Sequence, residues 1–372
     1  MKRQIFVGAA VFIGFWTLMF VGWNLTLRTP LVKTQIGYDG VAMTQLDFAD
    51  DLAAKENDPI HVAPEEVYPL EEGDLEGDRA GDIYENVQVL GHLSDAQFNR
   101  FMAQITEWVS PEQGCAYCHG EDGNFAHDAY YQKIVARWMI RMTQNINGNW
   151  GDHVAPAGVN CYTCHRGKNN PDNRWFTDVS AVETSGKLGW KAGGNEPGIG
   201  LATLPKDPYT PFLLGDAQVW ALSDNVHPGQ EGTKGTKHTE WTYALMNHMS
   251  IGLGVNCTYC HNSRNFGSWE QSPPTRTKAW YGIRMVRDAN ANYVAPTVAV
   301  NPVDQLGPTG DVSKIYCTTC HYNIAKPLYG ADMISAYPSL QAPGPQPWPT
   351  EDALMLDPKP EEASLETGTA VQ

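Results

Sequence analysis

Four segments of this chain combine two cysteines and a histidine at a spacing that suits covalent haem. Each reads Cys-x-x-Cys-His, and together they use all eight cysteines of the 372 residues. The motifs are Cys115/Cys118/His119, Cys161/Cys164/His165, Cys257/Cys260/His261 and Cys317/Cys320/His321. In such a motif the thiols form thioethers with the porphyrin vinyl groups, and the histidine ligates the iron. The pattern predicts four covalently attached haem c groups.

Zinc binding and disulfide formation are the two competing uses of paired cysteines. Zinc sites do not explain a histidine directly after the second cysteine in all four cases. A disulfide framework does not require that histidine either. The fourfold recurrence of the complete motif therefore favours haem attachment over both alternatives.

Methionines in the helix predicted before each of the first three motifs are candidates for the sixth iron ligand. They are Met102, the pair Met139 and Met142, and the pair Met246 and Met249. A thioether is a good sixth ligand that raises the reduction potential, whereas a second imidazole gives a lower potential. Core packing is the alternative role of any single methionine. Both members of an i, i+3 pair lie on one helix face, so spacing does not decide between them.

The regions before the second and fourth motifs resemble each other, with one informative difference. Residues 140–142 and 283–285 are both Ile-Arg-Met, and Gly282 then stands where the first copy has Met139. The first copy also carries three extra residues, one of which is His153. We therefore predict two pseudo-repeated dihaem halves. The fourth haem lacks a methionine at Gly282, and His153 is its predicted distal ligand, while Met285 packs in the core.

The composition favours a mainly α fold with long irregular loops, as in a multihaem cytochrome c. Only 18% of residues are charged, while there are 35 glycines and 25 prolines. Apolar periodicity predicts four longer helices, and Ser94 with Gln97 resembles a capping box that begins the first of them. The helices are expected at about 94–111, 129–146, 239–252 and 276–291. Residues 168–235 show no clear period and are expected to connect the two halves.

The N-terminus carries an uncharged stretch from Ile5 to Leu27. As a helix it would be roughly 35 Å long, enough for a bilayer core. A cleaved signal peptide has a shorter apolar core and a small-residue exit, which this stretch lacks. We therefore expect residues 1–28 to form a retained transmembrane helix, with Lys2 and Arg3 on the cytoplasmic side. Because haem c is attached outside the cytoplasm, the haem domain is expected in the periplasm.

Acidic residues are concentrated between the expected anchor and the haem domain. Fourteen lie from Asp47 to Glu85 against two basic residues, in a chain whose net charge is −16. The segment is either a solvated, extended connector or an acidic surface for a basic partner. Nucleic acid is a poor partner for it. The expected domains are an anchor at 1–28, an acidic connector at 29–85, a tetrahaem domain at 86–340 and a Pro/Glu-rich tail at 341–372.

At the motif regions the chain resembles the tetrahaem cytochrome subunit bound to photosynthetic reaction centres of purple bacteria. The matching stretches fall within residues 85–335 and include NVQVLGHLSDAQFNRFMAQITEWVSPEQGCAYCH, HVAPAGVNCYTCHRG, LGVNCTYCHNSRNFGSW and WYGIRMVRDANANYVAP. The chain departs from the pattern at its N-terminus, since many members carry a lipidated cysteine and this chain has an apolar helix. Its long acidic segment and tail also lie outside the shared pattern.

The resemblance implies a ligand set and an order of haems. Met102, Met139 and Met246 are then the sixth ligands of haems one, two and three, numbered by motif, and His153 is the distal ligand of haem four. It further implies that haem three lies nearest the photo-oxidised bacteriochlorophyll pair, followed outward by haems four, two and one. An arginine near haem three corresponds to Arg276.

These observations favour an electron carrier over an enzyme, because six-coordinate irons leave no position for a substrate. The expected function is re-reduction of the photo-oxidised special pair with electrons from a soluble periplasmic donor, such as a cytochrome c. Expected partners are the other reaction-centre subunits, that donor and the photosynthetic membrane. The alternative is a membrane-anchored tetrahaem quinol dehydrogenase. Those proteins are usually much smaller and use mainly histidine as distal ligand. A multihaem reductase is a third class and would need an open coordination site.

Overall fold

The computed structural model describes residues 2–27, 31–36, 38, 43–178, 204–205, 207–219 and 236–341. The chain divides into two compact units, Met1–His61 and Val62–Gln372. Nearly all of the expected tail at 341–372, and a large part of the expected connection at 168–235, lie outside the described residues.

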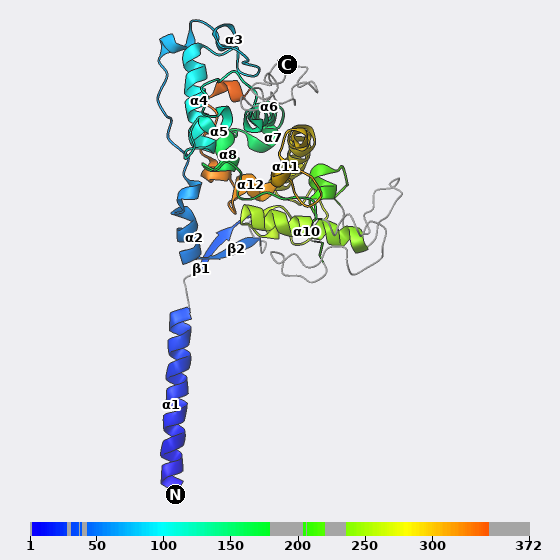
Figure 1. Cartoon of the computed structure of the whole chain (residues 1–372). Coiled ribbons are helices and arrows are strands. Elements are labelled where there is room, and N and C mark those ends of the chain that lie inside the picture. The colour runs from blue at the N-terminus through cyan, green and yellow to red at the C-terminus, as the bar shows by residue number, and fades with distance from the viewer. Residues whose placement is uncertain are drawn as a thin grey trace, which may run out of the picture. The chain divides into compact units, whose positions relative to one another are not determined.

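The first unit consists of a long helix, a β-hairpin and a short helix (Figure 1). Its elements are α1 (Lys2–Leu27), β1 (Leu31–Gln35), β2 (Thr44–Phe48), α2 (Ala49–Glu56) and the 3-10 turn η1 (Pro59–His61). The two strands pair antiparallel, with Leu31 opposite Phe48 and Gln35 opposite Thr44. The sequence did not predict this hairpin, because its strands are short and mostly exposed and carry no clear apolar alternation.

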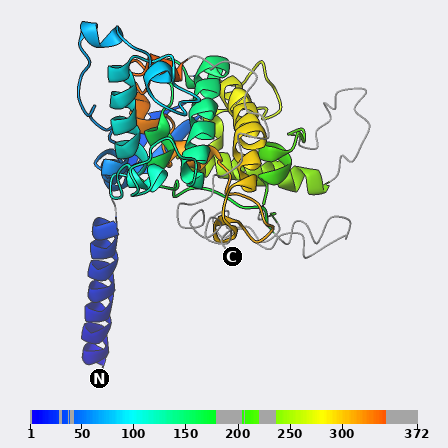
Figure 2. The same cartoon turned by 45° about the horizontal axis from the view of Figure 1, so that its top comes forward.

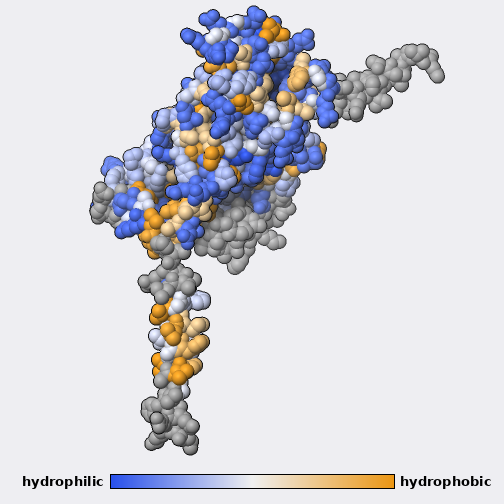
Figure 3. Space-filling view, turned by 90° about the vertical axis from the view of Figure 1, so that its left-hand side faces the viewer, coloured by the Kyte–Doolittle hydropathy of each residue, from blue (hydrophilic) through white to orange (hydrophobic). Residues whose placement is uncertain are grey.

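Helix α1 covers the stretch that we expected to cross the membrane. Its described side chains are largely apolar and exposed, as Phe12, Trp16 and Phe20 illustrate (Figure 3). Among the described residues, however, no helix is long and apolar enough to span a membrane. The predicted transmembrane helix at 1–28 is therefore not supported by this structure.

Four longer helices form the framework of the second unit, as the sequence predicted. They are α4 (Asp95–Val109), α6 (Tyr131–Asn149), α10 (Thr236–Leu253) and α11 (Thr275–Ala289). The predicted capping box is present at the start of α4. The backbone N–H of Gln97 donates to Ser94 Oγ, and the backbone N–H of Ser94 donates to Gln97 Oε1. This cap satisfies two donors that helix formation leaves unpaired.

Helices α6 and α11 lie side by side in both views of the ribbon (Figures 1 and 2). Asp288 at the end of α11 joins them, because its Oδ2 accepts from Asn145 Nδ2 (2.6 Å) and from Trp150 Nε1 (2.9 Å). The largest apolar core contains residues of both helices, including Met142 and Met285. The core position predicted for Met285 is thus confirmed.

Short helical elements make up the rest of the second unit. Two of them, α8 (Cys161–His165) and α12 (Cys317–His321), contain a whole Cys-x-x-Cys-His motif, and α5 (Ala116–His119) begins directly after Cys115. The third motif begins with the 3-10 turn η4 (Cys257–Tyr259). The others are η2 (Glu72–Leu75), α3 (Ala80–Ile83), α7 (Gly151–Val154), η3 (Thr210–Leu214), η5 (Asn290–Val294), η6 (Ala295–Ala299), η7 (Val303–Gln305), η8 (Pro327–Gly330) and η9 (Pro338–Leu340). The described part of this unit is mainly helical with long loops.

The acidic segment is folded against α4 from residue 62 onward and is not an extended chain. Glu66 forms an ion pair with the buried Arg100 of α4 at 2.5 Å. The backbone N–H of Val67 donates to Gln104 Oε1 (2.8 Å), and Ser94 Oγ donates to the carbonyl oxygen of Asp74 (2.5 Å). The acidic residues that stay exposed are therefore held at the helix that carries Met102.

Candidate functional site

The residues expected to bind the first two haems line one cavity of about 990 Å³. This volume lies at the upper end of the roughly 300–1,000 Å³ range of ligand pockets. Both cysteine pairs and both motif histidines contribute to its wall, together with Met102 from α4 and Met139 from α6. Met142 lines the same cavity, so the choice between Met139 and Met142 is not made by position alone.

Five histidines share one hydrogen-bonding arrangement. In each, Nδ1 lies within hydrogen-bond distance of a backbone carbonyl oxygen: His119 to Phe125 (3.2 Å), His153 to Lys278 (2.8 Å), His165 to Lys168 (2.9 Å), His261 to Phe266 (2.8 Å) and His321 to Ile324 (3.0 Å). A carbonyl oxygen only accepts, so Nδ1 carries the proton and Nε2 keeps its lone pair. Histidines that ligate metals are typically oriented in this way.

The environment of these histidines favours the neutral imidazole that ligation needs. Burial lowers the pKa of all five below the ordinary value of 6.5. The largest effect is at His321, whose pKa falls to about 4 through burial and, secondarily, through the neighbouring His153. A charged imidazolium would have no lone pair for a metal. The lowered pKa values and the proton on Nδ1 therefore both favour a neutral ring whose Nε2 can bind a metal.

The rings of His153 and His321 lie close together at a separation that can be compared with that of two iron ligands. Their ring centres are 6.1 Å apart, and the ring planes are inclined by 65°. Metal–imidazole bonds are about 2 Å long and a ring centre lies about 1 Å behind its nitrogen, so two axial imidazoles have centres about 6 Å apart. The fold thus brings together two residues 168 positions apart in the sequence at a separation that fits a bis-histidine haem.

Gly282 provides the space that the His153 ring occupies. A Cβ built on Gly282 would lie 2.6 Å from His153 Cε1 and 3.0 Å from Nδ1. Real Cβ atoms essentially never come closer than 3.0 Å to another heavy atom, so the 2.6 Å contact with Cε1 could not form. A methionine at position 282 is therefore incompatible with His153 in this position. The missing methionine and the extra histidine are two parts of one local arrangement.

The residues expected at the third haem lie on consecutive elements. Met246 belongs to α10, which ends four residues before Cys257, and the motif is followed by α11. Arg276 lies in the first turn of α11, and its Nη1 donates to the carbonyl oxygen of Ser268 (2.9 Å). Its guanidinium also covers the ring of Trp269 at 4.1 Å. Its positive charge helps to lower the pKa of His261, after the larger effect of burial, so the cation lies near this motif.

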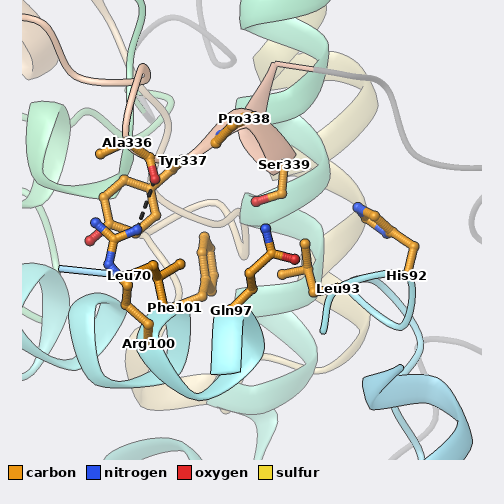
Figure 4. Close-up of a pocket in the computed structure, with 10 residues that line it drawn as sticks. All are labelled: Leu70, His92, Leu93, Gln97, Arg100, Phe101, Ala336, Tyr337, Pro338 and Ser339. Carbon is orange, nitrogen blue, oxygen red and sulfur yellow. Dashed lines mark hydrogen bonds between the residues drawn. The ribbon is translucent and has the colours of Figure 1, made fainter. Parts of the chain in front are cut away.

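A smaller pocket of about 280 Å³ shows how the C-terminal part of the described chain is held (Figure 4). Arg100 Nη1 donates to the carbonyl oxygen of Ala336 (2.9 Å), and the guanidinium lies over the Tyr337 ring at 4.4 Å. Gln144 Nε2 donates to the carbonyl oxygen of Ser339 (2.8 Å). These bonds join residues 336–339 to both α4 and α6, the helices that carry Met102 and Met139.

Arg166 is a residue of interest that sequence reasoning missed. It follows His165 directly, is only 6% exposed, and contacts the fourth motif. Its position immediately after a motif was the available signal, but the carbonyl group that its side chain binds, that of Cys320, lies 154 residues away.

Comparison with known proteins identifies the family. Residues 28–341 match the family described as "Photosynthetic reaction centre cytochrome C subunit". The chain is 46% identical over 316 residues to the photosynthetic reaction center cytochrome c subunit of Rubrivivax gelatinosus, covering 84% of each chain. It is 42% identical over 313 residues to that of Thermochromatium tepidum, covering 84% of this chain and 75% of the relative.

The chain belongs to this family. A third relative, the reaction center cytochrome c subunit of Roseobacter denitrificans, is 42% identical over 278 residues and covers 70% of this chain and 73% of its own length. As a reaction-centre cytochrome c, the chain carries covalently bound haem c and transfers electrons. The resemblance inferred from the motifs is confirmed, and these relatives give no support to a quinol dehydrogenase.

Proposed function

We propose that this chain carries four haem c groups and re-reduces the photo-oxidised bacteriochlorophyll pair of a reaction centre. The eight motif cysteines hold the haems, and His119, His165, His261 and His321 are the proximal ligands. Met102, Met139 and Met246 are the sixth ligands of haems one, two and three, and His153 is that of haem four. Each haem supplies one-electron redox chemistry, while the polypeptide sets ligation, spacing and local charge.

The arrangement of His153, His321 and Gly282 is the observation that carries this proposal. Four motif histidines alone would suit several kinds of multihaem protein. A fifth imidazole with the same Nδ1 bond, opposite the fourth motif and over a glycine, supports one bis-histidine site. The three methionine-bearing helices support His/Met ligation elsewhere. Such a mixture provides haems of different potential within one chain.

Electron entry is proposed at haem one and exit at haem three. The exposed carboxylates of the folded acidic segment lie on elements packed against α4, which supplies Met102. This surface suits a basic soluble cytochrome, whose approach it would accelerate more than it would strengthen binding. At haem three, Arg276 adds a positive charge that disfavours the ferric form and raises the potential. We place the haem domain in the periplasm and the complex at the photosynthetic membrane.

Purification from membranes in mild detergent tests the proposal. The intact mass of the chain should exceed that of the polypeptide by four haems, and bacteriochlorophyll should co-purify. After a flash, pigment re-reduction should match haem oxidation in time and amount. A mass gain of three haems or fewer would refute the cofactor count, and haems that stay reduced after the flash would refute the proposed role.

A further inference from the structure

The second and fourth motifs meet in a reciprocal contact made by the residue that follows each histidine. Arg166 Nη2 donates to the carbonyl oxygen of Cys320 (3.2 Å), and Tyr322 Oη donates to the carbonyl oxygen of Cys164 (3.2 Å). Both residues have a positive φ, 52° for Arg166 and 49° for Tyr322, which is uncommon outside glycine. The sulfur atoms of Cys164 and Cys320 lie side by side at this junction. Each motif thus reaches across to the backbone of the other.

Arg166 brings a buried positive charge to this junction. The residue is 6% exposed, and its guanidinium lies near two aromatic rings, those of Tyr162 (5.6 Å) and Tyr322 (4.9 Å). Its Nε and Nη1 atoms are buried and have no hydrogen-bond partner among the described residues. A guanidinium stays protonated even when burial lowers its pKa, as it does here.

No carboxylate neutralises this charge within the part of the chain that the structure describes. The nearby Asp172 pairs with Lys168 at 2.5 Å instead. The groups whose charges act on the pKa of Arg166 are Cys164, Cys320, Tyr322 and Tyr162. The two cysteine sulfurs become neutral thioethers once haem is attached. A buried cation with no counter-charge from the protein is normally costly, so its position at the junction of the second and fourth motifs calls for a role.

We propose that Arg166 is a shared electrostatic control of haems two and four and raises both reduction potentials. This inference rests on the proposed function. Oxidation adds a positive charge to a haem, and a nearby cation makes that change less favourable in a medium of low dielectric constant. Because the guanidinium contacts both motifs, one residue acts on two haems of different ligation. Equal shifts leave the difference between haems two and four unchanged. They bring the potential of the bis-histidine haem four closer to that of haem three, its other neighbour in the proposed order.

Spectroscopic redox titration of the intact complex tests this role. Arg166→Gln should lower the reduction equilibrium constants of two haems about tenfold, or about 59 mV for each one-electron couple. One of the two should be the bis-histidine haem, which its spectrum distinguishes. Arg166→Lys keeps the charge and should restore most of both shifts. Tyr322→Phe removes the reciprocal hydrogen bond without a change in charge and should leave both midpoints nearly unchanged.

The outcomes separate this inference from the proposed function. Fewer than four one-electron components in the unaltered protein would refute the proposed haem count. The unaltered protein could show four components while Arg166→Gln shifts only one of them or none. That result would overturn the shared control by Arg166 and leave the proposed function standing. Equal shifts in Tyr322→Phe would assign the effect to packing and overturn it as well. If Arg166→Gln fails to load haem, Arg166→Met fills similar space without a buried polar group and should show the same two shifts.

Discussion

The imidazole of His153 lies directly against the backbone of Gly282, where a Cβ would come within 2.6 Å of Cε1. The contact joins the short helix α7 to the middle of α11, and the imidazole lies with its ring centre 6.1 Å from that of His321. It gives a physical reason for the bis-histidine ligation that we propose for one haem. A side chain at position 282 and an imidazole at position 153 compete for the same space.

Gly282→Ala is expected to displace His153 and to weaken or remove the bis-histidine haem. Within a helix, alanine is otherwise more favourable than glycine by about 1 kcal/mol. Helix propensity would therefore not explain a loss of the bis-histidine haem. Gly151→Ala is the matched control, because nothing lies within 4 Å of a Cβ there. Electron paramagnetic resonance of the oxidised protein reports the change. An unaltered bis-histidine signal in Gly282→Ala would contradict the placement of His153.

His153→Met is expected to raise the lowest of the four midpoint potentials. Replacing an imidazole by a thioether favours the ferrous form, so the titration wave of haem four should move upward. The other three haems keep their own ligands and should move much less. Four unchanged midpoints would show that His153 is not an iron ligand.

Asp128 is expected to stabilise the fold around the first haem through a buried ion-pair cluster. It pairs with Lys133 and Arg137 at 2.7 Å each, and all three side chains are largely buried. Asp128→Asn leaves two buried cations and should cost about 3 kcal/mol, seen as a lower apparent Tm. Asp172→Asn is the control, because its pair with Lys168 is exposed and worth about 0–1 kcal/mol.

The Asp128 cluster also predicts how the stabilising effect of this carboxylate changes with pH. Burial acts to raise the pKa of Asp128, but hydrogen bonds from Arg137 and Lys133 outweigh it and hold the pKa below the ordinary 3.8. A carboxyl group whose pKa is lower in the folded than in the unfolded protein stabilises the fold at pH values above its unfolded pKa. That stabilisation is lost as the pH falls through the folded-state pKa. The Tm difference between the unaltered protein and Asp128→Asn should therefore shrink below about pH 4. A difference that grows on acidification would contradict this account.

The acidic segment is expected to accelerate the arrival of a basic donor. Donor oxidation should slow as ionic strength rises, because the Debye length is only about 8 Å at physiological salt. Neutralising the exposed Glu71, Glu72 and Glu76 should reduce that dependence on salt. Neutralising Asp50 and Asp51 on α2, outside the part of the segment that packs on α4, is the control. A rate indifferent to salt would indicate an apolar docking site.

Much of the site could be predicted because its determinants are local in sequence. The cysteine spacing, the Ser94 cap and the four longer helices follow from short-range patterns, and the structure agrees with them. The distal role of His153 came from comparing two copies within one chain. Its ligation, like that of the three methionines, stays a prediction.

Other features could not be predicted because they depend on distant contacts. The junction of Arg166 and Tyr322 joins residues far apart in sequence, and no periodicity marks it. The acidic segment reads as a solvated chain by composition, yet Glu66 and Val67 are held by polar side chains of α4. Such contacts become visible only when the helices are in place.

Flash photolysis of the purified complex with all haems reduced tests the central claim most directly. Haem three is expected to be the immediate donor to the pigment pair. Met246→His should lower its potential and change the fastest phase of pigment re-reduction, whereas Met102→His should leave that phase nearly intact. If Met102→His alters the fastest phase and Met246→His does not, then haem one faces the pigment and the proposed direction of electron flow is reversed.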